Sequence, residues 1–134
     1  MTIARIALPV AAYATFDYWM PAGLAATRGA IVRVRLGRRA LCGVVVDVVD
    51  TSSVPREKLQ PIGEVLRSLP ALAPDLMELA EFVAGYYQEP LGMVLAQMTP
   101  PMGTDAGAFV RALPQRLRLT AEGRAALPAR LARA

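Results

Sequence analysis

The segment from residue 30 to residue 49 limits the fold of this chain most strongly, because it predicts two paired β-strands. Apolar and polar side chains alternate over Ala30–Leu36, which is the period-2 pattern of a strand with one buried face. Gly37 is most simply the glycine of a hairpin turn, and Ala40–Val49 is nearly all apolar, as in a central strand. The buried face of the first strand would carry Val32, Val34 and Leu36, and the outer face Arg33 and Arg35. A sheet built around this hairpin is the expected core.

Shorter segments on either side of the hairpin predict further strands. Ile3–Leu8 ends at Pro9, which suits an edge strand because proline cannot donate to a β-ladder. Thr15–Trp19 is β-branched and aromatic, and a short strand is expected around Ile62–Leu66. Gly43, inside the central strand, indicates a bulge or a close backbone approach. We therefore expect a small curled, mainly antiparallel sheet of about five or six strands.

Two amphipathic helices are predicted after the sheet. Apolar residues from Leu76 to Val83 recur at helical spacing, and Pro74 with Asp75 favours a helix start, so a helix is expected over roughly 75–87. The second helix begins with Pro90 and repeats the spacing to Met98. The repeating residues of the first helix are Leu76, Leu79, Ala80 and Val83. The predicted fold class is α+β, with residues 1–105 as one domain.

Residues 106–134 form a tail of different character, rich in glycine, alanine and arginine. The alternating Arg116–Leu119 is typical of a strand, and Thr120 could cap a short helix over Ala121–Leu127 that Pro128 would stop. The segment is too short to bury a core of its own. We expect a loosely ordered tail.

Composition excludes several kinds of chemistry. The 134 residues include one cysteine, Cys42, and no histidine, so an intramolecular disulfide, a zinc site and a histidine-based catalytic pair are not expected. Phosphate-binding glycine motifs are absent, as are an acidic metal cluster, a signal-peptide layout and an apolar run of ~20 residues that could span a bilayer. A cytoplasmic protein without metal or cofactor is the expectation.

The net charge of +4 is unevenly distributed. Residues 1–110 contain nine basic and ten acidic residues, whereas residues 111–134 contain six arginines and one glutamate. Between Asp17 and Asp47 there is no acidic residue, and five arginines form a local basic patch that would attract phosphates. These arginines are Arg28, Arg33, Arg35, Arg38 and Arg39. The alternative is a solvated sheet face.

Aromatic residues supply the second candidate feature. Phe16 and Tyr18 would share one face of their strand and flank Asp17, which places a carboxylate among aromatic rings. The alternative is core packing beside a solvated aspartate. Tyr86 and Tyr87, at the end of the first helix, are expected to be core and rim residues.

Several short motifs stand together in a fixed order over residues 3–102. The motifs are ALPV at 7–10, TFDY at 15–18, P-x-G at 21–23, G-x-x-V-R-V-x-x-G-R at 29–38, G-V-V-V at 43–46, EVL at 64–66, the tyrosines at 86–87 and PLG at 90–92. With these motifs in this order, the chain resembles the N-terminal 3′-DNA-binding domain of the primosomal protein N′ (PriA) replication-restart helicase family.

The resemblance implies a module that binds the 3′ end of a DNA strand at stalled replication forks. The parent is an ATP-dependent 3′-to-5′ helicase whose motor is absent from this chain, so no enzymatic activity is expected here. Implied partners are DNA, the remaining helicase domains, other primosome proteins and single-strand-binding protein, with no membrane. Beyond about residue 110 the chain resembles the start of the family's winged-helix domain.

The resemblance also implies a 3′-end pocket. Its residues are Phe16, Asp17, Tyr18 and Gly37, and Gln60 stands where the family has a lysine. Lys58, Arg38 and Arg39 are nearby cations that could replace that charge, and Arg33 and Arg35 would contact the DNA backbone. The alternative function is a protein-interaction module with an arginine-rich sheet face. A preference for a free 3′-hydroxyl end would separate the two.

Overall fold

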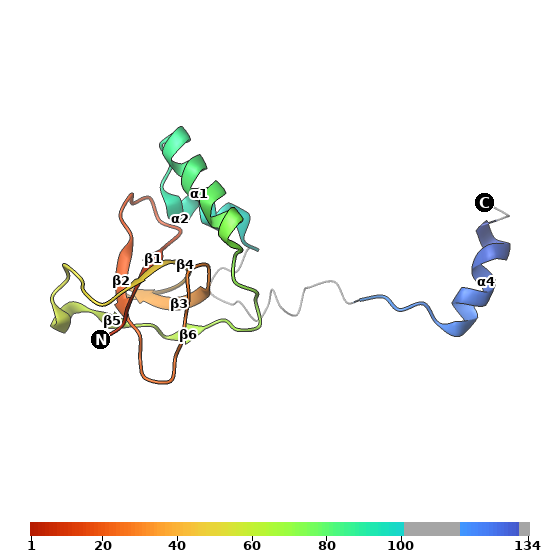
Figure 1. Ribbon diagram of the computed structural model, residues 1–134, viewed down its shortest axis with the longest axis horizontal. Coiled ribbons are helices and arrows are strands. Elements are labelled where there is room, and N and C mark those ends of the chain that lie inside the picture. The colour runs from red at the N-terminus through yellow and green to blue at the C-terminus, as the bar shows by residue number, and fades with distance from the viewer. Residues whose placement is uncertain (101–115, 132–134) are drawn as a thin grey trace.

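The computed structural model describes residues 1–100 and 116–131, and in the first of these ranges a six-stranded sheet carries two helices on one side (Figure 1). The strand order is β5-β2-β1-β4-β3-β6, with antiparallel pairs throughout except for β2 and β5, which are parallel. The α+β fold with a mainly antiparallel sheet is confirmed. The strands are β1 (Ile3–Ala7), β2 (Phe16–Trp19), β3 (Ile31–Leu36), β4 (Arg39–Val49), β5 (Gln60–Pro61) and β6 (Glu64–Val65).

The predicted hairpin is β3 and β4, and its turn contains Gly37 at a φ of 62°. A positive φ is strained for residues with a Cβ, so glycine suits this turn. β4 lies between β1 and β3, which confirms its central position. A Cβ at Gly43 would lie 2.6 Å from Ile6 Cγ2, so this glycine permits a close approach of β1. The register shift between β1 and β4 lies elsewhere, opposite Val46.

β1 is an inner strand, paired with both β2 and β4, and the expectation of an edge strand was wrong. Pro9 lies two residues beyond the end of β1 at Ala7. Its missing amide therefore falls outside the ladder and does not prevent pairing on both sides.

One short segment joins the two edges of the curled sheet. β5 pairs with β2 at one edge and β6 pairs with β3 at the other, although only Ile62 and Gly63 separate them. The amide of Ile62 donates to the carbonyl oxygen of Trp19, and the amide of Gly63 donates to that of Arg33, each at 3.0 Å. The end of β2 at Trp19 and the middle of β3 at Arg33 are thereby brought close together.

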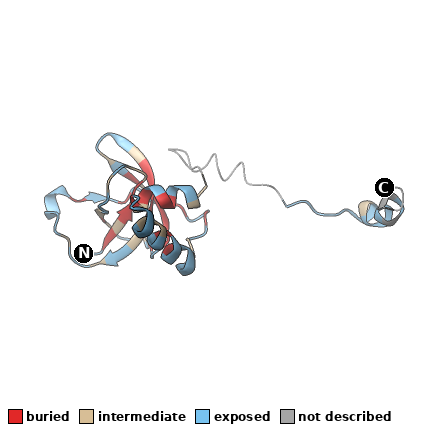
Figure 2. Ribbon diagram, turned by 90° about the horizontal axis from the view of Figure 1, so that it is seen from above, coloured by how far each residue is buried: buried red, intermediate tan, exposed pale blue. Residues whose placement is uncertain are grey.

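Apolar side chains fill both faces of the sheet. One cluster lies inside the curl and includes Ile6, Val34 and Val45, together with Tyr18. The other lies between the sheet and the helices, where Ile31 and Val44 meet Leu95. Figure 2 shows the buried residues concentrated in the strands and where the helices meet them.

The two predicted helices are present as α1 (Pro74–Tyr87) and α2 (Leu91–Met98). The buried residues of α1 are Met77 and Ala80, whereas Leu76 and Leu79 are exposed, so the predicted apolar stripe was partly wrong. Apolar residues occur on several sides of this helix, and periodicity alone does not choose among them. Packing in the cluster that α1 shares with α2 and the sheet selects the side with Met77 and the small Ala80.

The described part of the tail contains α4 (Ala121–Leu131). Arg116–Leu119 is not in a strand, because alternation alone forms no ladder without a partner strand among the described residues. The helix continues past Pro128, where a stop was expected, because a proline that removes one amide donor and crowds the preceding turn can kink a helix without ending it. The expected looseness of residues 106–115 and 132–134 lies outside the described residues.

Candidate nucleic-acid interface

An open pocket of about 380 Å³ lies where β2, the β3–β4 turn and the segment after β4 meet. It contains all five residues expected at the 3′-end site, although they come from three separate parts of the chain. Two of the expected backbone-contacting cations, Arg35 and Lys58, also line it. The complete lining consists of Arg5, Thr15, Phe16, Asp17, Tyr18, Arg35, Leu36, Gly37, Ser53, Val54, Lys58 and Gln60.

Tyr18 joins the two strands that form the pocket walls. Its hydroxyl donates a hydrogen bond of 2.7 Å to the backbone carbonyl oxygen of Arg35. The ring is buried in the cluster inside the sheet, and this burial raises the pKa of the Tyr18 hydroxyl. Phe16 is only half-buried, so it is the more accessible of the two aromatic rings in the pocket.

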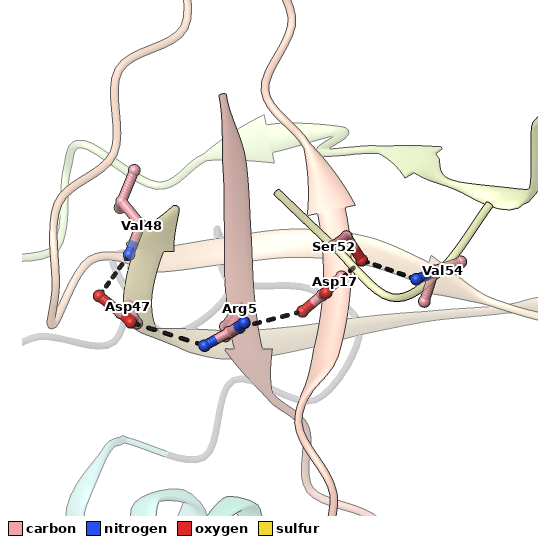
Figure 3. A network of polar contacts seen from close by, with 6 residues as sticks. All are labelled: Arg5, Asp17, Asp47, Val48, Ser52 and Val54. Atoms are coloured by element: carbon pink, nitrogen blue, oxygen red, sulfur yellow. Dashed lines mark hydrogen bonds and ion pairs between the residues drawn. The ribbon is translucent and has the colours of Figure 1, made fainter. Parts of the chain in front are cut away.

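Asp17 is held by polar contacts, and its side chain is only 11% exposed. Its Oδ2 accepts a hydrogen bond from the Ser52 hydroxyl, and its Oδ1 lies 3.7 Å from Arg5 Nε (Figure 3). Arg5 also lies 3.8 Å from Asp47, on the strand at its other side. The interpretation of Asp17 as a solvated aspartate was therefore wrong.

The ion pairs follow from strand register. Arg5 on β1 stands opposite Asp17 on β2 and Asp47 on β4, so three charged side chains cross the sheet in one row. Opposite charges at paired positions of neighbouring strands stabilise a sheet by roughly 0.2–1 kcal/mol each. The row fixes Arg5 between two carboxylates at the pocket rim.

The cations around the pocket outnumber its acidic residues. Arg35 and Lys58 are exposed and line the pocket, and no ion pair of either is found among the described residues. Gln60 lies beside Tyr18 through the β2–β5 pairing. The pocket therefore combines one carboxylate that is already partnered with two cations available to an anion.

The other predicted arginines lie away from the pocket lining. Arg33 Nη1 is 3.3 Å from Glu64 Oε2 on β6, and its Nε is buried without a hydrogen-bond partner. Arg28 forms an ion pair of 2.7 Å with Glu81 on α1. Arg38 and Arg39 are exposed at the hairpin turn. The expected basic patch is thus divided, and Arg35 is its only member in the pocket lining.

Sequence reasoning missed Arg5 and Ser52. Arg5 stands alone in an apolar strand and Ser52 lies in a polar loop, so neither forms a motif. Their roles depend on strand register and on the fold of the loop after β4. The sequence contains no local signal for either.

Tyr86 and Tyr87 are exposed and not core or rim residues, which corrects the prediction. Phe82, Tyr86 and Tyr87 are 64%, 69% and 66% exposed on α1. Their rings contact one another, with centroids 5.7 Å apart for Phe82 and Tyr86, and 4.9 Å for Tyr86 and Tyr87. Phe82 and Tyr86 lie on the side of α1 away from the buried Met77 and Ala80, and Tyr87 is the last residue of the helix.

Cys42 is buried, and burial raises the pKa of its thiol, with a smaller opposing effect from Arg33. Within residues 1–100 and 116–131, there is no group of three or more histidine, cysteine, aspartate or glutamate residues that could hold a metal ion. None of the described helices is long and apolar enough to cross a membrane.

A family model and two relatives with similar sequences indicate the same family. The family model of the PriA 3′ DNA-binding domain (3′BD) matches residues 5–100. The chain is 35% identical over 100 residues to the replication restart protein PriA of Haemophilus influenzae, covering 75% of this chain and 14% of that protein. It is 30% identical over 102 residues to the PriA of Rickettsia conorii, covering 76% and 15%. The chain thus spans about a seventh of the length of these relatives.

Proposed function

Because this chain belongs to the family of PriA 3′ DNA-binding domains, we propose that it binds the 3′ end of single-stranded or nascent leading-strand DNA at stalled replication forks in the cytoplasm. The family supports a DNA-binding role in replication restart, and the segment is a DNA-binding module and not the helicase motor. The remainder of the parent protein would supply the ATP-dependent 3′-to-5′ helicase and primosome assembly. Residues 1–105 are the proposed binding unit, since every pocket residue lies within them.

One observation carries the proposal: Asp17 and Gly37 share a pocket with Arg35 and Lys58. A terminal nucleotide offers a free 3′-hydroxyl and one phosphate on its 5′ side. The carboxylate can accept a hydrogen bond from the hydroxyl, and the two cations can bind the phosphate. A strand that continued past the pocket would place a second phosphate near Asp17, and repulsion would disfavour it.

Lys58 is the proposed replacement for the lysine that the family has at the position of Gln60. Leu59 between them has an extended backbone, with φ and ψ of −70° and 125°, and its side chain is buried. Lys58 is the last residue of a short 3₁₀-helix, η1 (Arg56–Lys58), and Gln60 is the first residue of β5. Lys58 and Gln60 both line the pocket, whereas Arg38 and Arg39 do not.

Stacking is assigned to Phe16 more than to Tyr18. An accessible ring can stack on a base of any identity, with a contribution of about 1–3 kcal/mol. Tyr18 is buried and its hydroxyl is engaged by Arg35. Its proposed role is to hold the two pocket walls together.

The experiment is fluorescence anisotropy with two matched oligonucleotides, one ending in a 3′-hydroxyl and one in a 3′-phosphate. Asp17→Asn retains the shape of the side chain and removes its charge. We expect it to lower the preference for the hydroxyl end by about tenfold, which corresponds to ~1.4 kcal/mol. Asp47→Asn removes the other carboxylate beside Arg5 and should leave the preference unchanged. A wild-type chain that binds both ends equally would refute the proposal.

Arg35 is proposed to contact phosphate, so its substitution should change the salt dependence of binding and not the end preference. Arg35→Ala should weaken binding to oligonucleotides of any sequence and reduce the salt slope by about 0.7. The end preference should persist, because Asp17 and Gly37 remain. Arg33 is a weaker candidate, since Glu64 already pairs with it.

A second candidate function, protein interaction, is favoured by the aromatic row of Phe82, Tyr86 and Tyr87 and not by the arginine face. Exposed aromatic clusters are typical of protein interfaces. Glu78 and Glu81 flank the row, no basic residue occurs from 68 to 110, and the charge of Arg28 is paired with Glu81 at 2.7 Å, so DNA is disfavoured there. The proposed partners are the remaining helicase domains, other primosome proteins or single-strand-binding protein. Calorimetric titration of the purified partners against wild type and Phe82→Ser tests this role.

A further inference from the structure

Asp17 has two neighbours that sequence motifs do not identify, and we propose that Ser52 and Arg5 are positioning residues that fix its carboxylate in the pocket. The inference rests on the proposed 3′-end function. It adds the loop that follows β4 to the end-recognition site, because Ser52 belongs to that loop.

The direction of the Ser52 hydrogen bond follows from its chemistry. The Ser52 hydroxyl oxygen accepts a hydrogen bond of 3.0 Å from the amide of Val54. A carboxylate has no proton to donate, so the single hydroxyl proton of Ser52 is directed to Asp17 Oδ2. The hydroxyl is thus engaged on both sides and cannot rotate freely.

Arg5 restrains the other carboxylate oxygen. It lies between Asp17 and Asp47 at nearly equal distances of 3.7 and 3.8 Å. Only the Asp17 side chain is well covered, at 11% exposure against 56% for Asp47. An ion pair is screened less where solvent is excluded, so Arg5 acts mainly on Asp17.

These contacts connect the carboxylate to the pocket wall (Figure 3). Asp17 holds Ser52, and Ser52 holds the turn to Val54, which lines the pocket beside Ser53. A carboxylate has about four acceptor positions, and one is used by Ser52. A position that neither Ser52 nor Arg5 occupies would accept the terminal hydroxyl, in an orientation that the two neighbours fix. Ser52 therefore determines end preference through Asp17, without contacting the DNA.

Ser52→Ala tests this role, with anisotropy measured on matched 3′-hydroxyl and 3′-phosphate oligonucleotides. We expect the preference for the hydroxyl end to fall several-fold, with the salt slope unchanged. Ser52→Thr retains the hydroxyl and should restore the preference. Thr51→Ala removes a neighbouring hydroxyl that does not line the pocket and should have no effect. In the Asp17→Asn background, Ser52→Ala should lower the preference no further.

The outcomes separate the two proposals. A wild-type chain without end preference refutes the proposed function and, with it, the positioning role. A wild-type preference that survives in Ser52→Ala overturns the positioning role alone. An equal loss of affinity for both ends assigns Ser52 a merely structural role and likewise overturns the inference.

Discussion

Substitution of Gly37 allows an effect on DNA binding to be measured separately from an effect on folding stability. Its φ of 62° is left-handed, and a Cβ built there would meet no heavy atom within 4 Å. Gly37→Ala therefore requires no repacking, and its cost is backbone strain of about 1–2 kcal/mol. Because Gly37 lines the pocket, the added methyl group would occupy space that we assign to the terminal nucleotide.

Gly23 is a matched control. It has a φ of 85°, its Cβ would also meet nothing within 4 Å, and it does not line the pocket. Gly23→Ala should therefore lose at least as much stability as Gly37→Ala, because its φ lies further from the left-handed minimum. In thermal unfolding each kcal/mol should lower Tm by about 4 °C for a chain of this size.

Anisotropy with a 3′-hydroxyl oligonucleotide then distinguishes the two variants. We expect Gly37→Ala to weaken binding by about tenfold, or ~1.4 kcal/mol, and Gly23→Ala to bind as the wild type does. Both are measured well below their melting temperatures, so lost binding does not reflect unfolding. Equal affinities of Gly37→Ala and wild type would refute the assignment of Gly37 to the nucleotide site.

Three further predictions concern the charge, the pocket wall and the sheet–helix contact. Lys58→Gln should reduce the salt slope of single-strand binding by about 0.7, whereas Arg56→Gln, outside the pocket lining, should not, as titrations at several salt concentrations would show. Tyr18→Phe removes the hydrogen bond to Arg35 and should cost ~1 kcal/mol in urea unfolding near neutral pH. The pKa of the Tyr18 hydroxyl is raised in the folded state, so the stabilisation by the neutral hydroxyl is complete below the unfolded pKa of about 10. This stabilisation is lost as pH rises through the folded pKa. Tyr18→Phe should therefore lose less stability than wild type as pH rises above about 10. Gly92→Ala would place a Cβ 1.7 Å from the carbonyl oxygen of Leu8 and should destabilise by about 3 kcal/mol, whereas Gly85→Ala, which meets nothing within 4 Å, should be neutral or stabilising by calorimetry.

Local patterns predicted the elements whose formation is local. The alternation over Ala30–Leu36 and the apolar run after it correspond to β3 and β4, and helical spacing located α1 and α2. Within residues 1–100 the errors concern where each element lies in the fold and which of its faces is buried. Pro9 suggested an edge for β1, yet the proline lies beyond the strand, and Leu76 and Leu79, predicted in the buried stripe of α1, are exposed.

The candidate site depended on residues that are distant in sequence. Local patterns singled out the carboxylate among aromatic residues and the arginine strand, but only the family resemblance placed Asp17, Gly37 and Gln60 together. Their proximity requires the sheet to curl until β2 and β3 approach each other. No periodicity over a single strand contains that information, and the same holds for Arg5 and Ser52, whose partners are set by strand register and loop structure.

The segment from Lys58 to Val65 explains why fold and site are difficult to separate in this domain. Ile62 and Gly63 donate the hydrogen bonds that join the two edges of the sheet, and Ile62 is buried inside the curl. The same segment presents Lys58 and Gln60 to the pocket. The two pairs of residues are therefore constrained differently. Packing and backbone hydrogen bonds fix Ile62 and Gly63, whereas Lys58 and Gln60 are exposed. Under the proposed function, a cation is needed on that exposed side but not at one particular position. Lys58 lines the same pocket as Gln60, so it can supply the cation when position 60 carries glutamine.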